Sequence, residues 1–270
     1  MNETDKQKPV ILAVAFGTSY AENREKTIGA IERALAEAFP EFEVRRAFTS
    51  HIIRKVLKKR DGIIVDGVGE ALERMANEGI KKVIVQPTHI MAGIEYEQAG
   101  DEMKAFEGRF GSLVLGENLL ETMGDIEELI RVIDEDTKAF ADGDTARVFM
   151  GHGSEHSDNS VYAKMQKAID EAGIKDMIIG TVEAKPDLYD AVAMVKKTGA
   201  KRVLLSPLMI VAGDHANNDM AGGDEDSWKS VFEKEGYEVS CRLEGLGSSK
   251  GVQSMIVKHC RETMEEQDRK

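Results

Sequence analysis

The sequence predicts an α/β protein built from two similar Rossmann-like domains, whose parallel sheets are covered by helices. The first observation is a long internal repeat. Residues 81–95 reappear without a gap as residues 201–215, and the copies share Lys, Val, Pro, Ile, Ala and Gly at matching positions. A second pairing aligns residues 13–19 with residues 149–155. These pairings indicate that one α/β unit has been used twice.

The second observation is the alternation of apolar runs with helical patterns. The apolar runs predict strands at residues 10–16, 42–48, 82–87, 146–151, 176–182, 202–207 and 237–243. Helical patterns fall between them, for example at residues 22–39, 66–79, 124–140 and 159–173, and a last one follows at residues 249–267. The strands are nearly continuous runs of Val, Ile and Leu, which is typical of parallel sheets that are buried on both faces.

The length of 270 residues allows two domains, each with its own core. We place an N-terminal α/β domain at residues 1–125 and a C-terminal α/β domain at residues 126–270, with the metal site in the second. No low-complexity linker separates them, so we expect the halves to pack closely around a cleft. The last helix, residues 249–267, is a candidate for crossing back and tying the halves together.

Composition excludes several classes of partner. There are 49 acidic and 36 basic residues, a formal charge of −13, whereas nucleic-acid binding needs a basic face. No apolar run is long enough to span a bilayer, and the first residues lack the features of an export signal. Cys241 and Cys260 form no CxxC motif, which fits a reducing cytoplasm. Walker A and GxGxxG motifs are absent, so we expect neither nucleotide nor flavin.

Polar side chains with metal-binding capacity follow three strands of the second half. His152 comes directly after the strand at 146–151, Glu183 follows the strand at 176–182, and His215 comes a few residues after 202–207. In an open parallel sheet, ligands bind beyond the carboxyl ends of the strands. Two imidazoles and one carboxylate suit a first-row divalent metal with open coordination positions, and the lack of thiolates disfavours structural zinc.

The first half carries different residues at the matching positions. Phe16 corresponds to His152 and Glu95 to His215, and His89 comes just after the strand at 82–87. The turn at residues 16–19 follows a strand and precedes a helix, where backbone N–H groups can hold a carboxylate or phosphate. A basic stretch fits either a solvated helix face or an anion-binding patch. It comprises Arg45, Arg46, Arg54, Lys55, Lys58, Lys59 and Arg60.

The remaining histidines predict no site of their own. His156 is four residues from His152, but it lies in a polar loop and is expected to be solvated. His51 and His259 lie in helical segments and are most simply surface or capping residues.

Several of these segments together resemble the anaerobic cobalt chelatases of cobalamin biosynthesis, two-domain class II chelatases related in fold to protoporphyrin ferrochelatase. The resemblance covers nearly the whole chain. It is carried by residues 16–20, 45–55, 88–97, 148–154, 182–187, 207–220 and 226–229.

The resemblance implies a lyase that inserts Co2+, its substrate metal, into the tetrapyrrole sirohydrochlorin without ATP. It implies that His152, Glu183 and His215 bind the metal and that His152, His215 and Glu95 are catalytic. It implies that His89 and Glu95 face the macrocycle. We add Phe16, Gly17, Thr18 and Ser19 as candidate substrate-binding residues, because their turn could supply hydrogen-bond donors to the substrate carboxylates.

The chemistry of insertion agrees with these residue types. Two pyrrole N–H protons must leave as the metal enters, and an imidazole with a pKa near ~6.5 can bind a cation and accept a proton. Glu95 could relay the second proton. Fe2+ or Ni2+ as the metal, precorrin-2 as the substrate and a homo-oligomeric assembly all stay open. So do a non-enzymatic two-lobed metal- or solute-binding protein and an enzyme of phosphorylated metabolites that uses residues 16–19.

Overall fold

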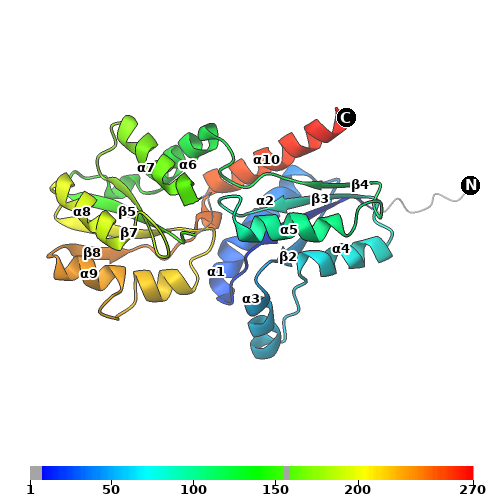
Figure 1. Ribbon diagram of the computed structural model, residues 1–270, viewed down its shortest axis with the longest axis horizontal. Coiled ribbons are helices and arrows are strands. Elements are labelled where there is room, and N and C mark those ends of the chain that lie inside the picture. The colour runs from blue at the N-terminus through cyan, green and yellow to red at the C-terminus, as the bar shows by residue number, and fades with distance from the viewer. Residues whose placement is uncertain (1–7, 155–158, 270) are drawn as a thin grey trace, which may run out of the picture. The chain divides into compact units, whose positions relative to one another are not determined.

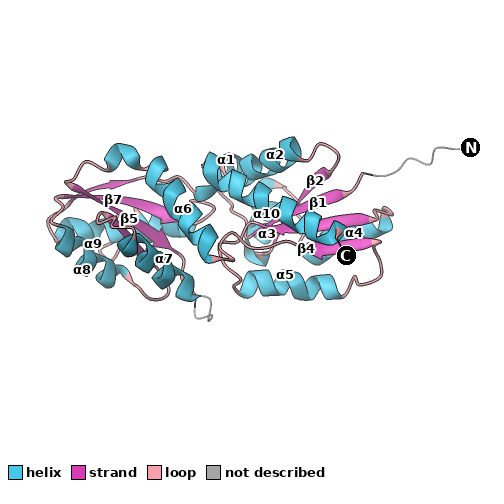
Figure 2. Ribbon diagram, turned by 90° about the horizontal axis from the view of Figure 1, so that it is seen from above, coloured by secondary structure: helices cyan, strands magenta, loops and turns pink. Residues whose placement is uncertain are grey.

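The computed structural model describes residues 8–154 and 159–269 and contains two parallel four-stranded sheets with helices packed against them (Figures 1 and 2). The predicted fold class is thus confirmed. Contacts divide the chain into two compact units. Unit 1 extends to Glu121 and resumes at Gln253, and unit 2 spans Thr122–Val252.

The sheet of unit 1 has the strand order β2-β1-β3-β4. Its strands are β1 (Val10–Ala15), β2 (Glu43–Phe48), β3 (Lys82–Pro87) and β4 (Ser112–Leu115). Its helices are α1 (Ala21–Lys26), α2 (Ile28–Ala38), α3 (His51–Val56), the π-helix η1 (Leu57–Asp61), α4 (Val68–Asn77) and α5 (Ile94–Lys104). Every residue of β1 is buried, because helices cover both faces of the sheet.

The sheet of unit 2 has the equivalent order β6-β5-β7-β8. Its strands are β5 (Thr145–Gly151), β6 (Met177–Thr181), β7 (Arg202–Leu208) and β8 (Glu238–Cys241). Its helices are α6 (Met123–Asp136), α7 (Ser160–Glu171), α8 (Leu188–Thr198) and α9 (Trp228–Lys234), with the π-helix η4 (Ala216–Met220) and the short 3-10 helices η2 (Lys138–Phe140) and η5 (Leu246–Ser248). The matching strand orders agree with the internal repeat.

Arg147 anchors the central strand of unit 2. It points from β5 and is 2% exposed, with Nε 2.7 Å from Asp176 and Nη1 2.7 Å from Asp134. Burial opposes its charge, but the two carboxylates outweigh burial and raise the pKa of the guanidinium. Because Asp134 lies on α6 and Asp176 directly precedes β6, this residue fixes β5 against two neighbouring elements.

The C-terminal helix α10 (Lys250–Asp268) corrects the predicted division of the chain. Residues from Gln253 onward group with unit 1, so their assignment to a C-terminal domain at 126–270 is wrong. Two contacts give the reason: Gln267 on α10 donates a hydrogen bond to Ser112 on β4, and the Arg261 guanidinium lies 5.0 Å from the centre of the Phe39 ring. The predicted crossing of this helix back to the first half is therefore observed.

Two smaller differences concern elements of unit 1. The helix predicted at residues 22–39 is interrupted at Thr27, whose hydroxyl donates to the Asn23 carbonyl at 2.6 Å and so competes with the helical backbone. Strand β4 was not predicted, because four half-buried residues give only a weak apolar run. Across the described ranges, the structure has no helix with the length and apolar character that a membrane span requires.

Candidate metal centre

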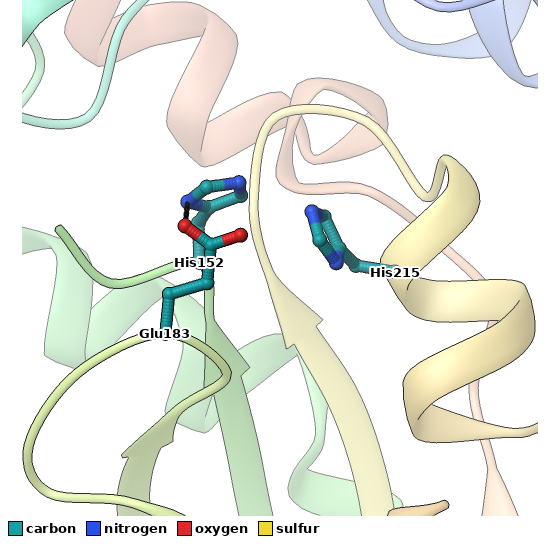
Figure 3. A group of neighbouring side chains, drawn as sticks. All are labelled: His152, Glu183 and His215. Carbon is teal, nitrogen blue, oxygen red and sulfur yellow. Dashed lines mark ion pairs between the residues drawn. The ribbon is translucent and has the colours of Figure 1, made fainter.

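Three adjacent strands of unit 2 bring His152, Glu183 and His215 together (Figure 3). His152 follows β5, Glu183 follows β6 and His215 follows β7, and β5 lies between the other two strands. From β5 the chain continues to β6 on one side of it, and then to β7 on the other side. This reversal of direction makes the carboxyl edge of β5 a topological switch point, where ligands bind in open parallel sheets. One ligand atom from each residue lies within 4.8 Å of those of the other two.

His152 is held in a turn that presents its imidazole to solvent. Its side chain is 46% exposed, and Nδ1 lies 2.8 Å from the Gly153 carbonyl and 3.7 Å from Glu183 Oε2. A carbonyl oxygen only accepts hydrogen bonds, so Nδ1 carries the proton and Nε2 keeps its lone pair. The turn therefore leaves Nε2, the nitrogen with the free lone pair, available as a candidate metal ligand.

His215 precedes η4 and is oriented by a carboxylate from the same segment. Its Nδ1 lies 2.5 Å from Asp219 Oδ2, so Nδ1–H donates and Nε2 is again available as a ligand. The two imidazole rings approach edge to face, with 4.6 Å between their centres. Asp219 was not predicted as a site residue, although its spacing of four from His215 in a helical segment was a usable signal.

Glu183 is tied to the His152 turn through the backbone. Its N–H donates to the His152 carbonyl at 2.9 Å, and the Val182 N–H donates to the Gly151 carbonyl at 3.0 Å. The Glu183 carboxylate is 54% exposed, so both solvent and the His152 ring are within its reach. The three side chains can act as a metal site with open positions and as proton acceptors.

The substrate-binding residues predicted for unit 1 lie at the carboxyl edge of its own sheet. Phe16 follows β1 and is 44% exposed, Gly17 and Thr18 are buried, and Ser19 is half-buried. Arg60 donates to the Ser19 carbonyl, and Arg24 donates to that of Thr18 at 3.2 Å. These contacts place two guanidinium groups beside the turn.

His89 and Glu95 also lie at this edge, after β3. Burial lowers the pKa of the His89 imidazole to about 4, so the ring is neutral at physiological pH. Its Nε2 lies 3.5 Å from Thr49 Oγ1. Glu95 is half-buried in the first turn of α5.

The basic stretch around α3 divides into paired arginines and exposed lysines. Each arginine contacts a carboxylate: Arg45 contacts Glu43 and Glu78, Arg46 contacts Glu32, Arg54 contacts Glu70, and Arg60 contacts Asp61. Lys55, Lys58 and Lys59 are exposed. These lysines, rather than Arg46 or Arg54, are the charges available to an anionic ligand.

The other histidines occupy different surroundings. His51 is exposed at the start of α3, as expected, and His156 lies outside the described residues. His259 on α10 is only 1% exposed, so its assignment to the surface is wrong.

The chain is similar in sequence to proteins of a known family. Residues 9–265 match the family described as cobalt chelatase (CbiK). A sirohydrochlorin cobaltochelatase of Salmonella typhimurium is 36% identical, over 95% of this chain and 97% of its own. The sirohydrochlorin cobaltochelatase CbiKC of Nitratidesulfovibrio vulgaris is 33% identical, over 93% of this chain and 89% of its own.

Two solved structures share the fold at low sequence identity. SirB from Bacillus subtilis with Fe3+ aligns with a TM-score of 0.63 and 13% identity, over 97% of both chains. CbiX, described as the terminal enzyme of siroheme biosynthesis in denitrifying bacteria, aligns with a TM-score of 0.55 and 15% identity, over 94% of this chain and 99% of its own.

Proposed function

The chain belongs to the cobalt chelatase (CbiK) family, and from this premise we propose that it inserts Co2+ into sirohydrochlorin in cobalamin biosynthesis. The observation that carries the proposal is the convergence of His152, Glu183 and His215 at one sheet edge. The metal is a substrate, and the reaction needs no ATP. The proposal keeps the predicted cytoplasmic location, which the free thiols of Cys241 and Cys260 support.

In the proposed first step, Co2+ binds to Nε2 of both imidazoles and to the Glu183 carboxylate. Three protein ligands leave coordination positions open for the pyrrole nitrogens of the macrocycle. Imidazole nitrogens are ligands of intermediate softness, and Co2+, Fe2+ and Ni2+ all bind to them. The ligand set alone therefore does not select among these metals.

The two protons that leave the macrocycle must be accepted by different bases at different stages of insertion. Two N–H bonds of the macrocycle break, and the resulting dianion binds the divalent cation. An imidazole nitrogen cannot hold the metal and a proton at once. We therefore assign the first proton to a carboxylate, Glu183 or Glu95, and the second to His152 Nε2 after the metal has moved to the ring.

Recognition of the eight substrate carboxylates requires local positive charge, since the chain as a whole carries a formal charge of −13. We assign this role to Lys55, Lys58 and Lys59, with the turn at 16–19 as a further donor. The contact of Arg60 with the Ser19 carbonyl supports the assignment, because it brings the lysine-bearing segment beside the turn. We keep Phe16 and His89 as proposed contacts with the macrocycle.

The test is to add Co2+ and sirohydrochlorin to the metal-free protein and follow the absorption spectrum of the macrocycle. The proposal expects many turnovers for each protein molecule. A protein that only binds metal would give at most one equivalent of product, and an enzyme of phosphorylated metabolites would give none above background. Repeating the assay with Fe2+ and Ni2+ ranks the metals by kcat/KM.

A further inference from the structure

A second group of metal-capable side chains lies within unit 1. Glu117 follows β4, and His259 and Glu262 lie one turn apart on α10. One ligand atom from each lies within 4.8 Å of those of the other two, the same limit that the His152 group meets. His259 is almost fully buried, Glu117 is half-buried and Glu262 is exposed.

We propose that Glu117, His259 and Glu262 form a second binding site for a first-row divalent cation, which fastens α10 to the loop after β4. One imidazole with two carboxylates is a ligand set that Zn2+, Co2+, Fe2+ and Mn2+ accept. Residues three apart on a helix share a face, so His259 and Glu262 can bind one ion together. The exposed carboxylate of Glu262 gives the ion a route from solvent.

The Glu117 side of the site is held by a buried amide. Gln86 on β3 is fully buried, and its Nε2 donates to the carbonyls of Pro87 at 2.9 Å and Glu117 at 3.1 Å. Reversing the amide would set its oxygen against both carbonyls, so this orientation is the stable one. Gly116 lies so close that a Cβ there would be 2.6 Å from Gln86 Oε1. The loop that carries Glu117 is therefore fixed against the sheet.

Two contacts of neighbouring residues hold the α10 side of the site. Thr263 Oγ1 donates to the His259 carbonyl at 2.9 Å, inside the helix. Arg261, between His259 and Glu262 in sequence, lies over the Phe39 ring, with 5.0 Å from the guanidinium carbon to the ring centre. The group thus combines two carboxylates and one imidazole, and a divalent cation balances the two negative charges.

The competing interpretation is a purely structural contact, in which His259 takes part in hydrogen bonds with carboxylates and no metal binds. The two interpretations differ in the number of metal ions that the protein binds apart from the ion at His152, Glu183 and His215: one in the first, none in the second. They can be separated without any assay of tetrapyrrole insertion.

The experiment uses the full chain carrying both His152→Ala and His215→Ala, so that the group of His152, Glu183 and His215 no longer binds metal. Co2+ is titrated by calorimetry at pH 7.5, and the visible spectrum of bound Co2+ is recorded. We expect one equivalent to bind and the thermal unfolding midpoint to rise with Co2+. Adding Glu262→Gln, a surface change that spares the buried His259, should weaken binding at least tenfold and remove the rise.

The matched control is Glu266→Gln, which removes the same charge from the same helix at an exposed position. It should leave both measurements unchanged. The proposal is overturned if the double histidine variant binds no Co2+, or if Glu262→Gln and Glu266→Gln behave alike.

Discussion

At the residue scale, the orientation of each imidazole depends on one acceptor at Nδ1. The Gly153 carbonyl holds the proton on His152 Nδ1, and the Asp219 carboxylate does the same for His215. Both histidines then keep an Nε2 lone pair, which is the proposed metal ligand. The carboxylate partner also makes the His215 nitrogen a stronger electron donor.

We predict that Asp219→Asn weakens Co2+ binding by about 10- to 100-fold while the fold is retained, because the amide no longer fixes the tautomer of His215. Calorimetric titration of metal into the variant measures this. Asp214→Asn, which changes a nearby carboxylate of the same loop, should have little effect. Equal affinity in wild type and Asp219→Asn would show that Asp219 does not orient the ligand.

The lowered pKa of the buried His89 imidazole leads us to predict that the folded protein loses stability at acidic pH. This pKa is about 4 in the folded protein and near 6.5 when unfolded. As the pH falls below 6.5, the unfolded chain gains a proton that the folded protein does not, so stability falls until about pH 4. The loss is at most roughly 3 kcal/mol. Urea unfolding at pH 7 and pH 4.5 should show a smaller loss for His89→Gln, whereas His51→Gln should resemble wild type.

The sequence predicted which residues of unit 2 converge, because the rule for parallel sheets puts the loops after β5, β6 and β7 at one edge. It did not predict the burial of His259. A helical segment with mixed polarity does not reveal which of its polar residues faces a neighbouring loop, and that depends on where α10 packs. The pairing of Arg46 with Glu32 was missed for the same reason, since the partners lie on separate elements.

At the scale of elements, the turn after β5 sets the positions of two proposed metal ligands, His152 and Glu183. Gly153 has φ +83°, and a Cβ there would lie 2.9 Å from the Ala184 nitrogen. A side chain at this position would therefore push the His152 turn away from the loop that carries Glu183.

We predict that Gly153→Ala lowers the rate of Co2+ insertion at least tenfold, by separating His152 from Glu183. Gly143→Ala is the matched control, because Gly143 has φ +84° but no atom within 4 Å of the added Cβ. Both variants bear the cost of a left-handed alanine, about 1–2 kcal/mol. Insertion rates at saturating metal and tetrapyrrole compare them, and equal rates would rule out the positional explanation.

The helices α3 and η1 carry the three exposed lysines that are proposed to bind the substrate carboxylates. Replacing Lys55, Lys58 and Lys59 with Gln should raise KM for sirohydrochlorin about tenfold and reduce its salt dependence, with a smaller change in kcat. A control variant replaces Lys164, Lys175 and Lys197, which are exposed lysines of unit 2. A KM that rises equally in both variants would point to net charge instead of a local contact.

Most elements were predictable because buried parallel strands leave long apolar runs. Strand β4 is the exception, since its four residues are all half-buried. The break at Thr27 depends on one side-chain hydrogen bond to the backbone, which hydrophobic periodicity does not report.

At the scale of the whole molecule, one topology is used twice with unequal loops. The sheet orders β2-β1-β3-β4 and β6-β5-β7-β8 are equivalent, yet Phe16 and Glu95 stand where unit 2 has His152 and His215. Strand cores are constrained by packing in both units, while the loops beyond them are free to differ. The unequal loops therefore explain why the proposed metal ligands all come from unit 2, whereas unit 1 offers Glu95 as a proposed proton acceptor.

The most direct measurement is the rate of Co2+ insertion into sirohydrochlorin by wild type, His152→Ala and His215→Ala, each confirmed as folded by circular dichroism. The account predicts multiple turnovers for wild type and a loss of at least 100-fold in both variants, because each removes a metal ligand and His152→Ala also removes a proton acceptor. Near-normal turnover in either variant would contradict it.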